Sequence, residues 1–144
     1  MPNAGITTDI IVGFPGETEE EFQETYDFVN EIGFSRIHVF KYSPRKGTPA
    51  SEFDNQIHGS VKHSRSERLI ELGNQLANRF MEKFIGKRME VLFEENKGGY
   101  FEGYTTNYIR VKAESNKDIQ GEILPVRIKT RENNDNLMGE IEEL

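Results

Sequence analysis

A short run of consecutive apolar residues that ends in a glycine-rich turn constrains the fold of this chain more than any other feature. The run is Thr8–Val12, and the turn is Gly13–Gly16. Unbroken apolarity over so few residues is typical of a parallel β-strand covered on both faces. We therefore predict a buried strand that passes through a tight turn into a helix.

The residues after the turn predict a helix and a second strand. Thr18 and Glu21 have the spacing of a capping box, and Gly33 supplies a helix stop. A strand over Arg36–Tyr42 follows, and strand, helix and strand with short connections predict a right-handed βαβ unit. The helix residues expected on the buried face are Phe22, Tyr26, Val29 and Ile32, and those of the second strand are Ile37, Val39 and Phe40.

One βαβ unit is too little to form a domain. Two parallel strands leave unpaired edges and cannot bury both of their faces. We interpret the unit as part of a larger sheet or barrel whose earlier strands are missing. The exposed edge at Thr8–Val12 predicts dimerisation or a strand swap.

The apolar period changes twice in the rest of the chain. Leucine and phenylalanine recur at helical spacing over Gly59–Ile85, and short strands separated by turn clusters follow from Met89 onward. The expected fold class is α/β plus all-β, with a small β-barrel of five strands after a connecting helix. The expected domains are residues 1–58, the helix 59–84 and the barrel 85–144.

Composition excludes several kinds of protein. The chain has no cysteine, which excludes disulfides, thiol nucleophiles and iron–sulfur clusters held only by its own thiolates. Its three histidines show no metal-ligand spacing, so we predict no metal site, and we expect the strand residue His38 to be a buried, satisfied imidazole. No signal peptide or membrane span is visible, and cytoplasmic location is the expectation. No catalytic group of nucleophile, base and orienting residue can be assembled.

Two loops are predicted at the carboxyl ends of the two strands, where α/β folds bind ligands. The first is the turn Gly13, Phe14, Pro15 and Gly16, whose amides suit polar or anionic groups. The second contains Ser43, Arg45 and Thr48. The alternatives are a tight βα turn and a solvated linker.

Basic residues alternate with apolar ones on two strands of the predicted barrel, so the basic side chains of each strand are expected to form a stripe that faces away from the core. Such stripes, with an aromatic side chain nearby, are typical of small barrels that hold nucleic acid. The alternative is a solvated strand face, and the block from Lys87 onward has nine Lys and Arg against twelve Asp and Glu, a net charge of −3. The candidate RNA-binding residues are Tyr108, Arg110, Lys112, Arg127, Lys129 and Arg131.

The amino-acid sequences of several segments resemble those of the radical-SAM methylthiotransferases. Ile6–Phe22 resembles their fifth barrel strand and the helix after it, and His38–Ala50 resembles the sixth strand and its exit loop. Arg65–Leu72 is similar to the next helix, and the block containing Gly103–Tyr108 is similar to their TRAM domain. Within the family, the first string looks most like the threonylcarbamoyladenosine tRNA branch.

The resemblance implies a tRNA-modifying enzyme that uses S-adenosylmethionine and two four-iron–four-sulfur clusters. It implies that Gly13, Phe14, Pro15 and Gly16 wall the S-adenosylmethionine site and that Ser43, Arg45 and Thr48 face the substrate. The TRAM barrel would bind the tRNA anticodon stem-loop. Because the family's CxxxCxxC motif is absent, we expect this chain alone to be inactive and to hold no cofactor.

Two rival hypotheses stay open. The first is the ribosomal-protein branch of the same family, in which the barrel holds a protein, and the net acidity of the third block supports it. The second is a non-enzymatic RNA-binding adaptor, and the incomplete βαβ unit argues against it.

Overall fold

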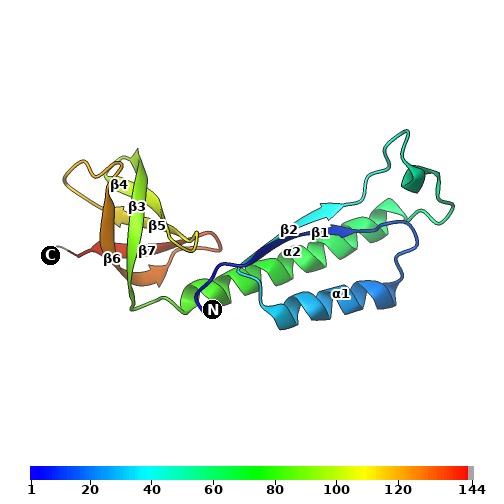
Figure 1. Cartoon of the computed structure of the whole chain (residues 1–144), viewed down its shortest axis with the longest axis horizontal. Coiled ribbons are helices and arrows are strands. Elements are labelled where there is room, and N and C mark those ends of the chain that lie inside the picture. The colour runs from blue at the N-terminus through cyan, green and yellow to red at the C-terminus, as the bar shows by residue number, and fades with distance from the viewer. Residues whose placement is uncertain (143–144) are drawn as a thin grey trace. The chain divides into compact units, whose positions relative to one another are not determined.

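The computed structural model describes residues 1–142, which divide into two compact units (Figure 1). One unit is Ile6–Leu76, and the other contains Met1–Gly5 and the residues from Ala77 onward. The predicted fold class is confirmed: a parallel strand pair with its helices precedes a closed five-stranded barrel. The three-part division at residues 58 and 84 stays a prediction.

The first unit contains the βαβ arrangement. Strands β1 (Thr7–Val12) and β2 (Arg36–Lys41) pair in parallel, with Thr7 opposite Arg36 and Val12 opposite Lys41. Helix α1 (Glu19–Ile32) connects them. The short 3₁₀ helix η1 (Pro49–Glu52) and the first part of α2 (Gly59–Glu82) complete this unit.

Local signals set the two ends of α1 as predicted. The Thr18 hydroxyl accepts a hydrogen bond from the Glu21 amide (3.1 Å), and Glu21 Oε1 accepts one from the Thr18 amide (3.3 Å). Gly33 ends the helix in the left-handed conformation (φ 71°). The predicted buried face is wrong at Ile32, which is 49% exposed. Ile32 lies roughly 80° around the helix from Phe22, at the margin of the buried stripe.

Only one face of the β1–β2 pair is covered. Val12 and partly buried Ile10 pack with α1 and α2 in a core that includes Phe22, Leu69 and Leu72. Alternate strand residues point the other way, and Ile11 (58% exposed) and Phe40 (54% exposed) lie there uncovered. The predictions of a strand covered on both faces and of a buried Phe40 are therefore wrong for the described residues.

Helix α2 ends at Glu82, three residues before the predicted end at Ile85. A turn follows, in which the Phe84 amide donates to Met81 O, and Gly86 (φ 84°) redirects the chain. Gly86 donates its amide to Ile128 O of the barrel rather than to the helix. None of the helices in residues 1–142 is long and apolar enough to cross a membrane.

The barrel has the strand order β3-β4-β5-β7-β6 and closes by pairing β6 with β3. Closure leaves no unpaired strand edge in this sheet, which protects a small domain from edge-to-edge association. Its core is one cluster of apolar side chains that includes Phe93, Phe101 and Val111 together with Phe80 of α2. The strands are β3 (Arg88–Lys97), β4 (Tyr100–Thr105), β5 (Arg110–Glu114), β6 (Ile123–Arg131) and β7 (Asn136–Ile141).

Candidate functional site

The open face of the β1–β2 pair ends in a hollow of about 600 Å³ at the carboxyl ends of the two strands. Side chains of the open face and of the loop after β2 line it together. This is the end of a parallel sheet where ligands bind in α/β folds. The lining residues are Asp9, Ile11, Phe40, Lys41, Tyr42, Ser43, Arg45, Thr48 and Ala50.

The structure brings the three predicted rim residues Ser43, Arg45 and Thr48 into this one hollow. The loop that carries them is locally bonded, because the Thr48 hydroxyl donates to Arg45 O (2.6 Å). Tyr42 adds an unused polar group: its hydroxyl is buried and has no hydrogen-bond partner among residues 1–142.

The turn Gly13–Gly16 does not line the hollow, and the amides of its two glycines have partners within the chain. The Gly13 amide donates to Glu17 Oε1 (2.9 Å), and the Gly16 amide donates to Asn55 O (2.9 Å). A Cβ on Gly13 would lie 2.1 Å from the Lys62 side chain, so glycine is required for packing inside this chain. The tight-turn interpretation fits these contacts. Of the turn residues, Phe14 contacts a residue that lines the hollow: its ring packs edge-to-face with that of Tyr42, with the ring centroids 5.3 Å apart.

A buried ion pair that sequence reasoning missed fixes this turn. Arg65 of α2 is 6% exposed, and its Nη1 donates to Glu17 Oε1 (2.8 Å) and to Glu17 O (3.0 Å). The same Glu17 oxygen accepts the Gly13 amide. One carboxylate therefore joins the turn after β1 to α2. The helical pattern gave a signal, since Arg65 precedes Leu69 by four residues on the buried stripe.

His38 is not the buried imidazole that the sequence predicts. It is exposed on the open face of β2, and its register partner on β1 is Asp9, which lines the hollow. The prediction failed because it assumed a sheet covered on both faces. A histidine and a carboxylate thus lie side by side on the face that leads to the hollow.

The residues present do not fit an iron–sulfur cluster. The chain has no cysteine, and no group of three His, Asp or Glu within the described part could hold a metal ion. S-adenosylmethionine fits the hollow only in part: the polar side chains of Ser43, Arg45 and Thr48 line it, whereas the amides of Gly13 and Gly16 are already bonded within the chain.

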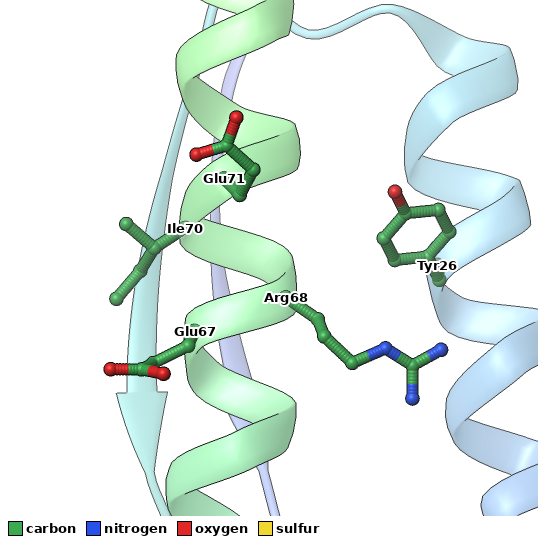
Figure 2. A pocket seen from close by; sticks show the side chains of 5 residues that line it. All are labelled: Tyr26, Glu67, Arg68, Ile70 and Glu71. Carbon is green, nitrogen blue, oxygen red and sulfur yellow. The ribbon is translucent and has the colours of Figure 1, made fainter.

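A second, shallow hollow lies between the helices and has a structural explanation. Figure 2 shows Arg68 of α2 reaching toward Tyr26 of α1, with Glu67 and Ile70 on the side of α2 turned away. The Arg68 guanidinium lies 4.7 Å from the Phe22 ring centroid and 2.6 Å from Glu19 Oε1. The hydrogen bond from Arg68 lowers the pKa of Glu19. These contacts hold α1 on α2.

On the barrel, the stripe of β5 points outward as predicted but is largely neutralised. Lys112 Nζ lies 3.0 Å from Glu132 and 3.6 Å from Glu102, and Lys97 Nζ lies 3.1 Å from Glu102. Burial raises the pKa of Glu102, but the Lys97 hydrogen bond and the charges of Lys97, Lys112 and Arg110 outweigh it and hold this pKa below its usual value. Glu102 is therefore an ionised carboxylate among three cations.

The basic residues of β6 also form ion pairs with glutamates, and the last of them, Arg131, does not point outward. Arg127 Nε lies 2.7 Å from Glu142, and Lys129 Nζ lies 3.6 Å from Glu140. A bulge between Ile128 and Thr130 shifts the register and places Arg131 opposite the fully buried Leu137. The prediction that Arg131 shares the outward face is therefore wrong, and its Nε lies 3.4 Å from Glu82 of α2.

Tyr108 and Arg110 are arranged differently from the paired cations. Tyr108 is 85% exposed in the turn between β4 and β5. Arg110 donates from Nη2 to the hydroxyl of Tyr104 (3.0 Å), a neutral partner, and its guanidinium lies 5.7 Å from the Tyr104 ring centroid. Arg110 and the Tyr104 ring thus lie together, and the exposed Tyr108 comes two residues before Arg110 in the chain.

The fold and these sites define an α/β unit with an open sheet face and a small barrel with a mixed-charge outer face. No protein-family model matches the chain, but individual proteins match nearly all of it. It is 44% identical over 133 residues to the threonylcarbamoyladenosine tRNA methylthiotransferase MtaB of Bacillus subtilis (strain 168), covering 89% of the chain and 30% of that protein. It is 42% identical over 146 residues to a tRNA-2-methylthio-N(6)-dimethylallyladenosine synthase of Symbiobacterium thermophilum, covering 99% and 31%.

A third relative, the enzyme of the same name from a Nitratiruptor species, is 44% identical over 98% of the chain and 33% of its own length. The chain thus spans about a third of the length of the curated relatives it matches. The predicted resemblance is confirmed: the chain is homologous to tRNA methylthiotransferases over about this third of their length.

Proposed function

We propose that this chain supplies two parts of a tRNA-modifying methylthiotransferase: one wall of the reaction chamber and a domain that holds the tRNA. The identity of 42–44% to enzymes named for tRNA methylthiolation, over 89–99% of the chain, carries the proposal. The β1–β2 pair supports the first part. Each strand has one unpaired edge, which fits a sheet that continues beyond these two strands, and the exposed Ile11 and Phe40 fit a face that further elements cover.

The chamber wall consists of the hollow at Tyr42, Ser43, Arg45 and Thr48, with Phe14 beside it. In such an enzyme S-adenosylmethionine and two four-iron–four-sulfur clusters supply the radical chemistry, and other residues must provide the cluster cysteines. In this chain Gly13, Pro15 and Gly16 act by holding Phe14 at the rim. The substrate is a modified adenosine beside the anticodon, and the threonylcarbamoyl form is the one we propose.

The ion pairs on the outer face of the barrel count against RNA binding and so favour the alternative, a methylthiotransferase that acts on a protein. Lys112, Arg127 and Lys129 already have carboxylate partners, so each phosphate must compete with a glutamate for them. RNA binding by the barrel is therefore expected to be weak and sensitive to salt.

Binding of a labelled tRNA anticodon stem-loop to the 144-residue chain tests the proposal. With about three to five phosphates contacted, log affinity should fall with log salt at a slope of about −2 to −4. Joint replacement of Arg110, Lys112, Arg127 and Lys129 by glutamine should remove the binding, whereas Arg36→Gln, at the amino end of β2 away from the hollow, should leave it nearly unchanged. Absence of binding at low salt, or equal loss in the control, would contradict the proposed role of the barrel.

Replacement of Glu102 is expected to increase the affinity of the barrel for RNA. Because its carboxylate holds Lys97 and Lys112, Glu102→Gln should release cations for phosphate and raise stem-loop affinity about fivefold near 0.1 M salt, as expected for one added phosphate contact. The salt dependence should become steeper by about 0.7–0.9. The control Glu90→Gln removes the same charge from an exposed position on β3. Equal gains in both variants would show a net-charge effect and contradict the role of Glu102.

A further inference from the structure

The turn between β4 and β5 holds a tyrosine in a conformation that tyrosine rarely adopts. Tyr108 has φ 63° and is the one non-glycine residue with positive φ in the part of the chain that the structure describes. This region is disfavoured for side chains with a Cβ and is usually occupied by glycine or asparagine. The side chain gains little packing in return, because it is 85% exposed.

Hydrogen bonds on both sides of Tyr108 fix the turn in this shape. The Tyr108 amide donates to Thr105 O (3.1 Å). The Thr105 amide donates to Ile109 O (3.0 Å), and the Ile109 amide donates to Thr105 Oγ1 (3.0 Å), so the turn is closed in both directions. Thr105 Oγ1 donates to Asn107 Oδ1 (2.5 Å), and Asn107 Nδ2 donates to Asn3 O (2.8 Å). Ile109 is 5% exposed and anchors the far side. A disfavoured backbone fixed by so many contacts is typical of functional positions.

The surroundings of this ring suit an unpaired nucleobase. Arg110 follows two residues later, and its guanidinium donates to the phenol of Tyr104, whereas Lys112 Nζ lies 3.0 Å from the Glu132 carboxylate. A fixed, exposed ring offers a face for stacking, and a nearby arginine can bind the adjacent phosphate. A base within a duplex cannot present its face to such a ring, so the ligand must be single-stranded.

We propose that Tyr108 is the stacking platform for one unpaired base of the bound RNA and that Arg110 binds a phosphate next to that base. This inference rests on the proposed function, and it narrows the ligand to a loop or other single-stranded segment. Stacking and charge contribute separately, because Tyr108 carries no charge and Arg110 does.

The test compares Tyr108→Asn and Tyr108→Phe, with the anticodon stem-loop and a fully paired duplex of equal length as probes. Asparagine tolerates the left-handed backbone, so Tyr108→Asn should fold at least as stably as the natural chain and yet bind the stem-loop about tenfold or more weakly. Its salt slope should not change. Tyr108→Phe should bind within about twofold. Arg110→Gln should instead reduce the slope by about one phosphate contact.

A 2-aminopurine base in the loop gives a direct readout, because stacking on tyrosine should quench its fluorescence in the natural chain and not in Tyr108→Asn. Two results would overturn the stacking role and leave RNA binding intact. One is equal stem-loop affinity in the natural chain and Tyr108→Asn, and the other is a loss of affinity in Tyr108→Asn that comes with a shallower salt dependence. No RNA binding by the natural chain at low salt would reject the proposed function itself. Tyr108-dependent binding of a basic peptide without RNA binding would assign this face to a protein and overturn the proposal.

Discussion

Gly103→Ala is expected to destabilise the barrel by about 3 kcal/mol, at the upper end of what overpacking costs. Gly103 lies on the inner side of β4 opposite Phe93, and a Cβ there would lie 2.1 Å from Leu92 O and 2.8 Å from Phe93 Cα. These are backbone atoms of β3, so no side-chain rotation can relieve the clash. A small domain has only about 5 kcal/mol of unfolding free energy, so most of its stability would be lost.

Native-state hydrogen exchange is the measurement of choice, because it reports protection element by element. Protection should fall at the amides of β3 and β4 and stay unchanged in α1, which belongs to the other unit. The matched control is Gly59→Ala, at the start of α2, where an added Cβ meets nothing within 4 Å. Gly59→Ala should be neutral or slightly stabilising. Equal protection in the Gly103 variant and the natural chain would contradict the tight approach of β4 to β3.

The elements were predictable because each has a local signal. The capping box at Thr18, the stop at Gly33 and the strand-sized apolar runs of the barrel act over a few residues, and the structure contains all of them. Which face of a strand is covered is decided elsewhere in the fold. The burial of Phe40 and His38 was predicted wrongly. Alternation along β2 shows that these two residues share one face, but it does not show which face is covered, and the helices α1 and α2 cover only the other one.

The candidate sites follow the same division. Alternation correctly placed Arg110 and Lys112 outside the barrel, but it could not foresee the bulge after Ile128 that redirects Arg131. Nor could a count of charges show that Glu102 lies between Lys97 and Lys112, since those three residues come from three strands. The local charge of a barrel face depends on cross-strand neighbours, which only the register supplies.

Arg65→Met is expected to destabilise the βαβ unit by about 3–5 kcal/mol. The side chain of Glu17 is 14% exposed, and without Arg65 its carboxylate would stay buried with the Gly13 amide but without a counter-charge. Loss of this anchor should also loosen the turn that holds Phe14 at the hollow. Chemical denaturation followed by circular dichroism measures the first effect, and hydrogen exchange at the Gly13 and Gly16 amides measures the second.

The same helix provides the control. Arg68 also pairs with a glutamate, but its side chain is 40% exposed and that of Glu19 is 62% exposed, so Arg68→Met should cost only about 1 kcal/mol. In a double-mutant cycle, Glu17→Gln should recover part of the loss in Arg65→Met, because the buried charge disappears with it. Equal costs for Arg65→Met and Arg68→Met, or additive effects in the cycle, would show that the Arg65–Glu17 pair does not hold the turn, and that packing alone fixes the rim of the hollow.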